Sequence, residues 1–104
     1  MEQALIVNIR MTEARFGSER ERVAIAALAD DLERVIPEKQ VGEFDGDEFG
    51  DGRCILYMYG PDADRLFEAV EPVLRAAAVA RDGFAIKRYG EASNKNAVEV
   101  RVNL

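Results

Sequence analysis

The sequence contains no histidine, which is the commonest general base in enzymes and the commonest transition-metal ligand in proteins. Its only cysteine is Cys54, and a single thiol cannot form an internal disulfide bond. A small secreted protein held together by disulfide bonds is therefore excluded. These absences favour a non-enzymatic domain without a catalytic residue, a metal ion or a cofactor.

Long apolar runs are also absent, so no segment has the length of a membrane-spanning helix. The first residues, MEQALIVNIRM, lack the basic leader and the small-residue cleavage site of a signal peptide. We therefore expect a cytoplasmic protein with no membrane partner. The length of 104 residues is that of one domain, residues 1–104, and is enough to bury a hydrophobic core.

Acidic residues are unevenly distributed along the chain, whose formal net charge is -6. The stretch from Gly42 to Gly52, GEFDGDEFGDG, holds five of the 20 acidic residues and no Lys or Arg. The acidity is therefore mostly a local feature. It disfavours a nucleic-acid partner, because a phosphate backbone would be repelled.

Hydrophobic residues that alternate with polar ones predict strands at residues 4–11, 41–49, 53–59, 84–89 and 97–104. Hydrophobic residues at helical spacing predict helices at 18–36 and 60–80. Ser18 and Glu21 fit a capping box at the start of the first helix, and Pro37 is expected to help end it. The order β-α-β-β-α-β-β is that of an α+β, ferredoxin-like sandwich with an extra C-terminal strand and two helices on one face of an antiparallel sheet.

The face of this sheet that the helices leave open is the first candidate site. We expect it to carry Asn8, Arg10, Tyr57, Tyr59, Lys87, Tyr89, Glu99 and Arg101. The candidates for an interface or a pocket are Asn8, Arg10, Tyr57, Tyr59, Tyr89 and Arg101, because an open sheet face with aromatic residues commonly packs against another surface. A register change of one residue in a strand would move its members to the other face.

The acidic segment is the second candidate site, and its glycines are typical of a hairpin. Both Asp45-Gly46 and Asp51-Gly52 favour a tight type I′ turn, and the sequence does not decide between them. Phe44 and Phe49 have opposite strand parity. Both can therefore face the core only if the strand contains a bulge, for which Gly46 or Gly50 would serve.

The carboxylates of this segment admit two functional interpretations. Asp45-Gly46-Asp47 is similar to the start of an EF-hand calcium loop, but Phe49 and Leu56 stand where that loop needs oxygen ligands. Alternatively, a carboxylate cluster framed by two aromatic residues suits a basic protein partner. The residues of that partner-binding surface would be Glu43, Phe44, Asp45, Asp47, Glu48, Phe49 and Asp51.

Two pieces of the chain, FDGDEFGDG and YMYGPDADRLF, lie within the block from Gly42 to Arg75. This block resembles one found in small bacterial proteins of unassigned function, and it covers about a third of the chain. The resemblance implies that the block is one structural unit. It implies no activity and no catalytic residue.

The function favoured by these features is that of a non-enzymatic binding or regulatory domain. It would use its acidic hairpin and its open sheet face for protein–protein association, with a homodimer expected and a basic protein as a further possible partner. The alternative is a small-molecule sensor or a small enzyme with a pocket at the sheet face near the acidic hairpin.

Overall fold

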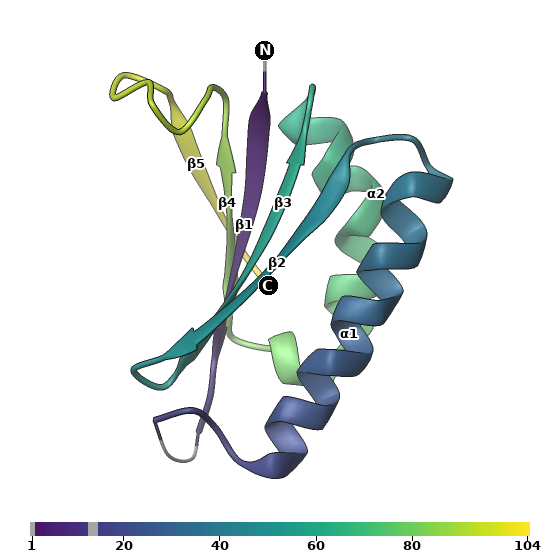
Figure 1. The fold of residues 1–104 in the computed structure, drawn as a ribbon, viewed down its shortest axis with the longest axis vertical. Helices are drawn as coiled ribbons and strands as arrows, with labels where there is room; N and C mark the ends of the chain where they lie inside the picture. Colours follow the sequence, from purple (N-terminus) through teal and green to yellow (C-terminus); the bar gives the residue numbers. More distant parts are fainter. Residues whose placement is uncertain (1, 13–14) are drawn as a thin grey trace.

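The computed structural model describes residues 2–12 and 15–104, which form one five-stranded sheet and two helices (Figure 1). In chain order the elements are β1 (Gln3–Arg10), α1 (Glu19–Glu38), β2 (Glu43–Gly50), β3 (Arg53–Gly60), α2 (Ala63–Ala76), the 3₁₀ turn η1 (Ala78–Ala80), β4 (Phe84–Arg88) and β5 (Glu99–Asn103). Both helices lie on the same side of the sheet (Figure 1).

The sheet has the strand order β2-β3-β1-β4-β5, and every neighbouring pair is antiparallel. The first four of these strands have the arrangement of a ferredoxin-like sandwich, and β5 extends the sheet beyond β4. The α+β fold expected from the sequence is therefore confirmed, including its extra C-terminal strand.

Each helix begins at a side chain that satisfies free backbone N–H groups. At α1 the Ser18 hydroxyl accepts from the Glu21 backbone N–H, and the Glu21 carboxylate accepts from that of Ser18. At α2 the Asp62 carboxylate accepts from the backbone N–H groups of Asp64 and Arg65. The capping box expected at α1 is confirmed. Its expected end is not, because the helix continues through Pro37 to Glu38.

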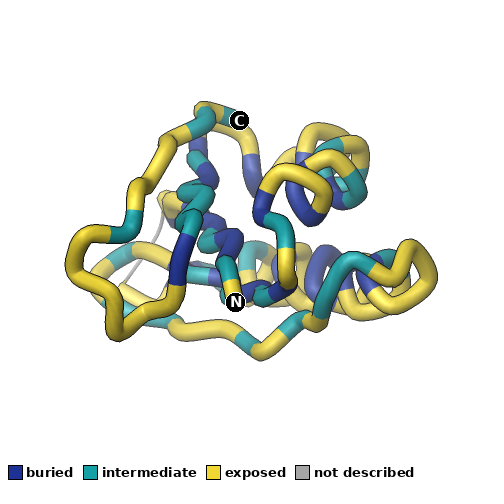
Figure 2. Tube along the Cα trace, turned by 90° about the horizontal axis from the view of Figure 1, so that it is seen from above, coloured by how far each residue is buried: buried dark blue, intermediate teal, exposed yellow. Residues whose placement is uncertain are grey.

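The hydrophobic core lies between the sheet and the helices, where the buried positions gather (Figure 2). Leu5, Val7 and Ile9 of β1 are fully buried, and their side chains alternate with those of the opposite face. Each such side chain contributes roughly 1.5–3 kcal/mol by leaving water. The helices add buried stripes made of Ile25, Leu28, Ala29, Leu32 and Ile36 in α1 and of Ala63, Leu66, Phe67, Val70 and Leu74 in α2.

The β2–β3 hairpin uses its two Asp-Gly steps for different purposes. Asp51 and Gly52 form the turn, with φ values of 52° and 76° that suit a type I′ connection. Gly46, with φ 140°, lies at a bulge where the register against β3 shifts between Phe44 and Gly46. The bulge expected from the spacing of Phe44 and Phe49 is therefore confirmed.

The last strand is shorter and more exposed than its sequence pattern suggested. Hydrophobic residues alternate over residues 97–104, but β5 pairs with β4 only from Glu99 to Asn103. Val98 is 63% exposed and Val100 is 42% exposed, since α2 covers β1, β3 and β4 but does not extend over β5. The alternating pattern of residues 97–104 therefore does not bury these two valines. Neither of the described helices has the length and apolar character needed to cross a membrane.

Candidate functional site

Strand register defines which side chains share the open face of the sheet. Residues directly opposite each other in an antiparallel pair project to the same side. Two adjacent rows of this kind cross the sheet from β2 to β5. One row consists of Gly46, Tyr57, Ile6, Ile86 and Arg101, and the next consists of Glu48, Ile55, Asn8, Phe84 and Asn103. A third row, Glu43, Tyr59, Ala4, Arg88 and Glu99, lies on the other side of the first.

The middle of this face is apolar and aromatic. Ile6, Tyr57 and Ile86 lie side by side on three adjacent strands, and each remains partly accessible to solvent. Burial and the nearby carboxylate of Glu48 raise the pKa of Tyr57 above its ordinary value. The phenol therefore stays protonated at neutral pH and can donate a hydrogen bond.

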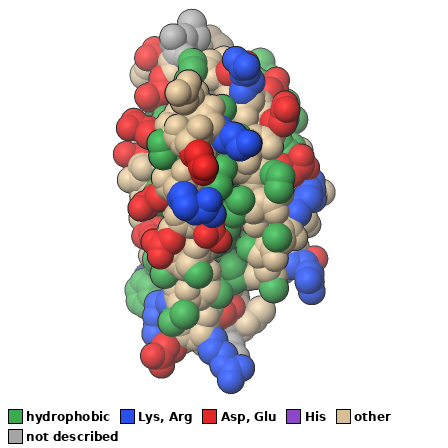
Figure 3. All heavy atoms as spheres, turned by 90° about the vertical axis from the view of Figure 1, so that its right-hand side faces the viewer, with side chains coloured by type: hydrophobic (Ala, Val, Ile, Leu, Met, Phe, Trp, Pro, Cys, Tyr) green, Lys and Arg blue, Asp and Glu red, His purple; other side chains and the backbone are tan. Residues whose placement is uncertain are grey.

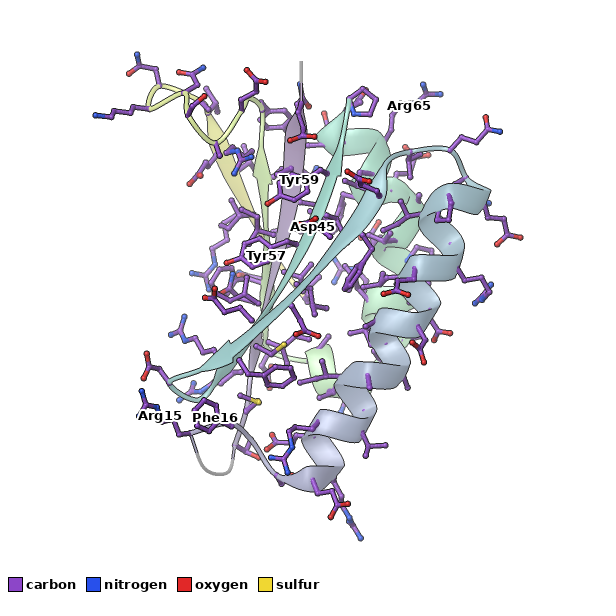
Figure 4. All side chains as sticks on the ribbon, in the orientation of Figure 1. Arg15, Phe16, Asp45, Tyr57, Tyr59 and Arg65 are labelled. Carbon is purple, nitrogen blue, oxygen red and sulfur yellow. The ribbon has the colours of Figure 1, made fainter. Side chains whose placement is uncertain are left out.

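The β2 edge of the face is acidic. Glu43 and Glu48 project onto it directly, and the bulge adds Asp45, which lies beside Tyr57 and Tyr59 in Figure 4. Asp47 pairs with the buried Leu56 and therefore projects to the helix side. The carboxylates of the acidic segment thus do not form one cluster.

Asp51 is separated from the other carboxylates at the tip of the hairpin. Its carboxylate lies 3.7 Å from Nε of Arg15, an exposed ion pair that contributes little to stability. The turn itself is held by the Gly52 backbone, which donates to the Arg15 carbonyl and accepts from the Met11 N–H. Asp51 therefore belongs to the contact between the hairpin and the segment after β1.

Phe44 and Phe49 do not project onto the open face of the sheet. Both are half-buried and pack against the hydrophobic core from the helix side of β2. Their side chains therefore do not share a face with Glu43 and Glu48, and their assignment to a partner-binding surface stays a prediction. The bulge at Gly46 places both phenyl rings on the same side of the strand, because the five positions from Phe44 to Phe49 pair with only four positions of β3, from Met58 to Cys54.

The β4–β5 side of the open face is basic. Arg88 and Arg101 project there, and the Arg101 guanidinium carbon lies 3.8 Å from the centre of the Phe84 ring. Arg88 donates from Nε to the Gly90 carbonyl. Carboxylates therefore gather on the β2 side of the open face, whereas β4 and β5 carry two guanidinium groups and the single carboxylate of Glu99.

Two residues assigned to this face lie on the other side of the sheet. Lys87 pairs with the buried Leu5, and its ammonium nitrogen lies 3.1 Å from Asp64 of α2. The Tyr89 hydroxyl donates to the same carboxylate oxygen at 2.6 Å. The hydrogen bonds from Tyr89 and Lys87 lower the pKa of Asp64, while the bond to Asp64 and burial raise the pKa of Tyr89 to about 12. The expected register of β4 was therefore wrong by one residue.

Neither metal binding nor thiol chemistry finds support in the geometry. Within residues 2–12 and 15–104, no three His, Cys, Asp or Glu side chains are arranged to hold a metal ion. The Asp45–Gly50 region is an edge strand and not the loop between two helices that an EF-hand requires. Cys54 is fully buried in the core, and burial, with a smaller effect of Asp47, raises its pKa to about 12.

Two cavities adjoin the open face at opposite ends. One, of about 340 Å³, lies by the start of the hairpin and is lined by Glu2, Gly42, Glu43, Tyr59, Gly60 and Pro61. The other, of about 130 Å³, is lined by Asn8, Ile9, Arg10, Arg53, Asp82, Gly83, Phe84 and Arg101. The helix side contrasts with this face, because acidic and basic side chains are interspersed over the outer surface of the helices (Figure 3).

Sequence reasoning missed several residues of the open face. Arg53, Phe84, Ile86 and Arg88 all project onto it or line its cavity. For β4 the signal was present but ambiguous, because FAIKRY alternates without a clear apolar side. For Arg53 the sequence showed only that it begins a strand. That it lies directly opposite Arg10 follows from the strand register alone.

Comparisons with protein-family models, curated proteins and solved structures find no match for this chain. The resemblance of the Gly42–Arg75 block to small bacterial proteins therefore stays a prediction. The open face has to be interpreted from its own geometry and charge.

Proposed function

We propose that this chain is a non-enzymatic association domain that binds protein through its open sheet face, and that its partner is a second copy of the same chain. The observation that carries the proposal is the apolar and aromatic centre of that face. Both described helices lie on the other side, so Ile6, Tyr57 and Ile86 have no covering layer. Burying such a surface stabilises a complex by about 25 cal/mol per Å² of apolar area, before the costs of association.

Charge polarity supports a second copy as the occupant. A two-fold axis parallel to β1 and lying between two stacked sheets would place β2 of one copy opposite β5 of the other. Asp45 then faces Arg101 of the partner subunit, and Tyr57 faces Ile86 of the partner subunit. An axis perpendicular to the strands would instead place the acidic strands opposite each other and cause repulsion.

Most of the other residues that face each other across this dimer interface can make favourable contacts. Ile55 faces Phe84 of the partner subunit, and Tyr59 faces Arg88 of the partner subunit, a pair suited to a cation–π contact. Like charges meet at the ends of the face, where Glu43 faces a partner Glu99 and the two Arg10 side chains approach each other. The centre of the face is therefore self-complementary and its ends are less so.

The contribution of the face is tested by comparing two substitutions that each introduce one carboxylate. Ile86→Glu places it at the centre of the open face, whereas Val23→Glu places it on the outer surface of α1, where Val23 is 63% exposed. In sedimentation velocity we expect the wild type and Val23→Glu to be dimers and Ile86→Glu to be a monomer. A wild type that stays monomeric at high concentration would contradict the proposal, and circular dichroism checks that each variant folds.

The orientation is tested by exchanging one charge pair. Asp45→Arg and Arg101→Asp should each weaken the dimer, because each creates like charges across the interface. The double variant restores opposite charges in the reversed sense and should recover most of the affinity. A double variant weaker than both single variants would exclude the axis parallel to β1 while leaving association through the face intact.

A further inference from the structure

The cavity of about 130 Å³ at one end of the open face is formed where three strands begin or end. Arg10 is the last residue of β1, Arg53 is the first of β3, and Asp82 and Gly83 precede β4. Arg101 of β5 completes the wall, with its guanidinium stacked on Phe84. Three arginines therefore line a small cavity in a protein whose net charge is -6.

The arrangement of the arginines is unfavourable without an anion. Arg10 and Arg53 are directly opposite each other in the β1–β3 pair, and like charges in such positions destabilise a sheet. Among residues 2–12 and 15–104, neither of them nor Arg101 forms an ion pair with a carboxylate. Asp82 also lines the cavity, so the lining side chains carry three positive charges and one negative charge.

We propose that this cavity binds a phosphate group, held by Arg10 and Arg53 and enclosed by Arg101. Guanidinium groups present paired N–H donors that match the oxygens of a phosphate and form charge-assisted hydrogen bonds with them. The side chain of Asn8 adds an amide donor at the cavity wall. The Phe84 ring adds an apolar surface that suits an organic group attached to the phosphate.

The proposal goes beyond the association function and does not depend on it, because the cavity is complete within one chain. The two proposals can be refuted separately. Phosphate binding is measured at the signals of the cavity residues, whereas dimerisation is measured as the molecular mass in solution. The bound phosphate group could belong either to free inorganic phosphate or to a larger phosphorylated molecule. Inorganic phosphate and phenyl phosphate serve as the two probes.

The experiment is an NMR titration of the ¹⁵N-labelled full chain with sodium phosphate, beside sodium chloride at matched ionic strength. We expect saturable shifts of the Arg10 and Arg53 side-chain Nε–H signals and of the Gly83 amide with phosphate, and small unsaturable shifts with chloride. Arg10→Gln and Arg53→Gln should each weaken binding about tenfold, the effect of losing one charge-assisted contact. Arg20→Gln, on the exposed surface of α1, changes the net charge equally and should leave the affinity unchanged.

Thermal unfolding provides an independent measurement. In phosphate-free, low-salt buffer Arg53→Gln should melt no lower than the wild type, because it removes the Arg10–Arg53 repulsion. Added phosphate should raise the Tm of the wild type more than that of Arg53→Gln. Tighter binding of phenyl phosphate assigns the site to a larger phosphorylated molecule, and equal binding assigns it to the free ion. Equal effects of phosphate and chloride, or an equal loss of affinity in Arg20→Gln, would overturn the proposal.

Discussion

Substitution of Gly46 tests directly whether the bulge places Phe44 and Phe49 on the same side of β2. Its φ of 140° lies in a region that residues with a Cβ rarely adopt, and an added Cβ would meet no atom within 4 Å. Gly46→Ala therefore introduces backbone strain without a steric clash. Strain of this kind costs about 1–3 kcal/mol. The chain could avoid it by pairing without a bulge, which would move Phe44 or Phe49 onto the open face.

The free-energy cost of pairing without the bulge sets an upper limit on the destabilisation by Gly46→Ala. Complete burial of a Phe side chain contributes roughly 1.5–3 kcal/mol, so exposing a half-buried one costs about 1 kcal/mol. We therefore expect Gly46→Ala to lower the free energy of unfolding by about 1–2 kcal/mol. At roughly 4–8 °C per kcal/mol for a domain of this size, the shift in Tm is easily measured.

Deletion of Gly46 should be less harmful than its replacement by alanine. Without this residue Phe44 stays opposite Met58 and Asp45 moves opposite Tyr57, so pairing is continuous and both phenyl rings remain on the helix side. Chemical denaturation of both variants gives the comparison. Gly50→Ala is the matched control, because Gly50 has no positive φ and its added Cβ also meets open space. A deletion that costs more than Gly46→Ala would refute this account of the bulge.

Two further predictions concern single side chains. Asp64→Asn should lower the free energy of unfolding at neutral pH, because the lowered pKa of Asp64 means that folding favours its ionised form. The difference in unfolding free energy between variant and wild type should shrink as the pH falls from about 5 through the pKa of Asp64 in the folded protein, which lies below the ordinary value of 3.8. A difference that is unchanged at pH 3 would contradict this, as judged by denaturant unfolding at several pH values. Cys54 should resist a disulfide reagent in the native protein at neutral pH and react fully in denaturant, since its buried thiol has a pKa of about 12. Rapid stoichiometric modification without denaturant would show that β3 opens more readily than its burial implies.

The sequence predicted the fold because strong local patterns agreed with one another. The alternation in β1, the Ser18 capping box and the parity of Phe44 and Phe49 each specified a feature that the structure contains. The register predicted for β4 was wrong because Ile86 and Lys87 do not show which side of the strand faces the core. The ion pair between Lys87 and Asp64 comes from tertiary packing, which the local sequence does not contain. Long side chains of this kind can pack their carbons against a core while keeping the charge near water.

The candidate sites were less predictable than the fold because they depend on register. Clustering of carboxylates in the sequence suggested one acidic surface, but strand alternation and the bulge distribute them over two faces and a turn. Conversely, Arg10 and Arg53 are 43 positions apart in the sequence and become neighbours only through the β1–β3 pairing. Local density of charge in a sequence is therefore a poor guide to density of charge on a sheet.

The two proposals converge at Arg10. A two-fold axis parallel to β1 brings the Arg10 side chains of both copies together at the end of the face, where each already faces its own Arg53. A bound phosphate would offset this repulsion, so phosphate should strengthen the dimer, and by linkage the dimer should bind phosphate more tightly than the monomer does. Sodium chloride at the same ionic strength should instead weaken the dimer, because it screens the Asp45–Arg101 contact. Sedimentation equilibrium in the two salts measures the difference. A dimer weakened by phosphate would mean that the anion and the second copy compete. They would compete either at the Arg10 end of the face or for Arg101, which lines the cavity and also faces Asp45 of the partner subunit.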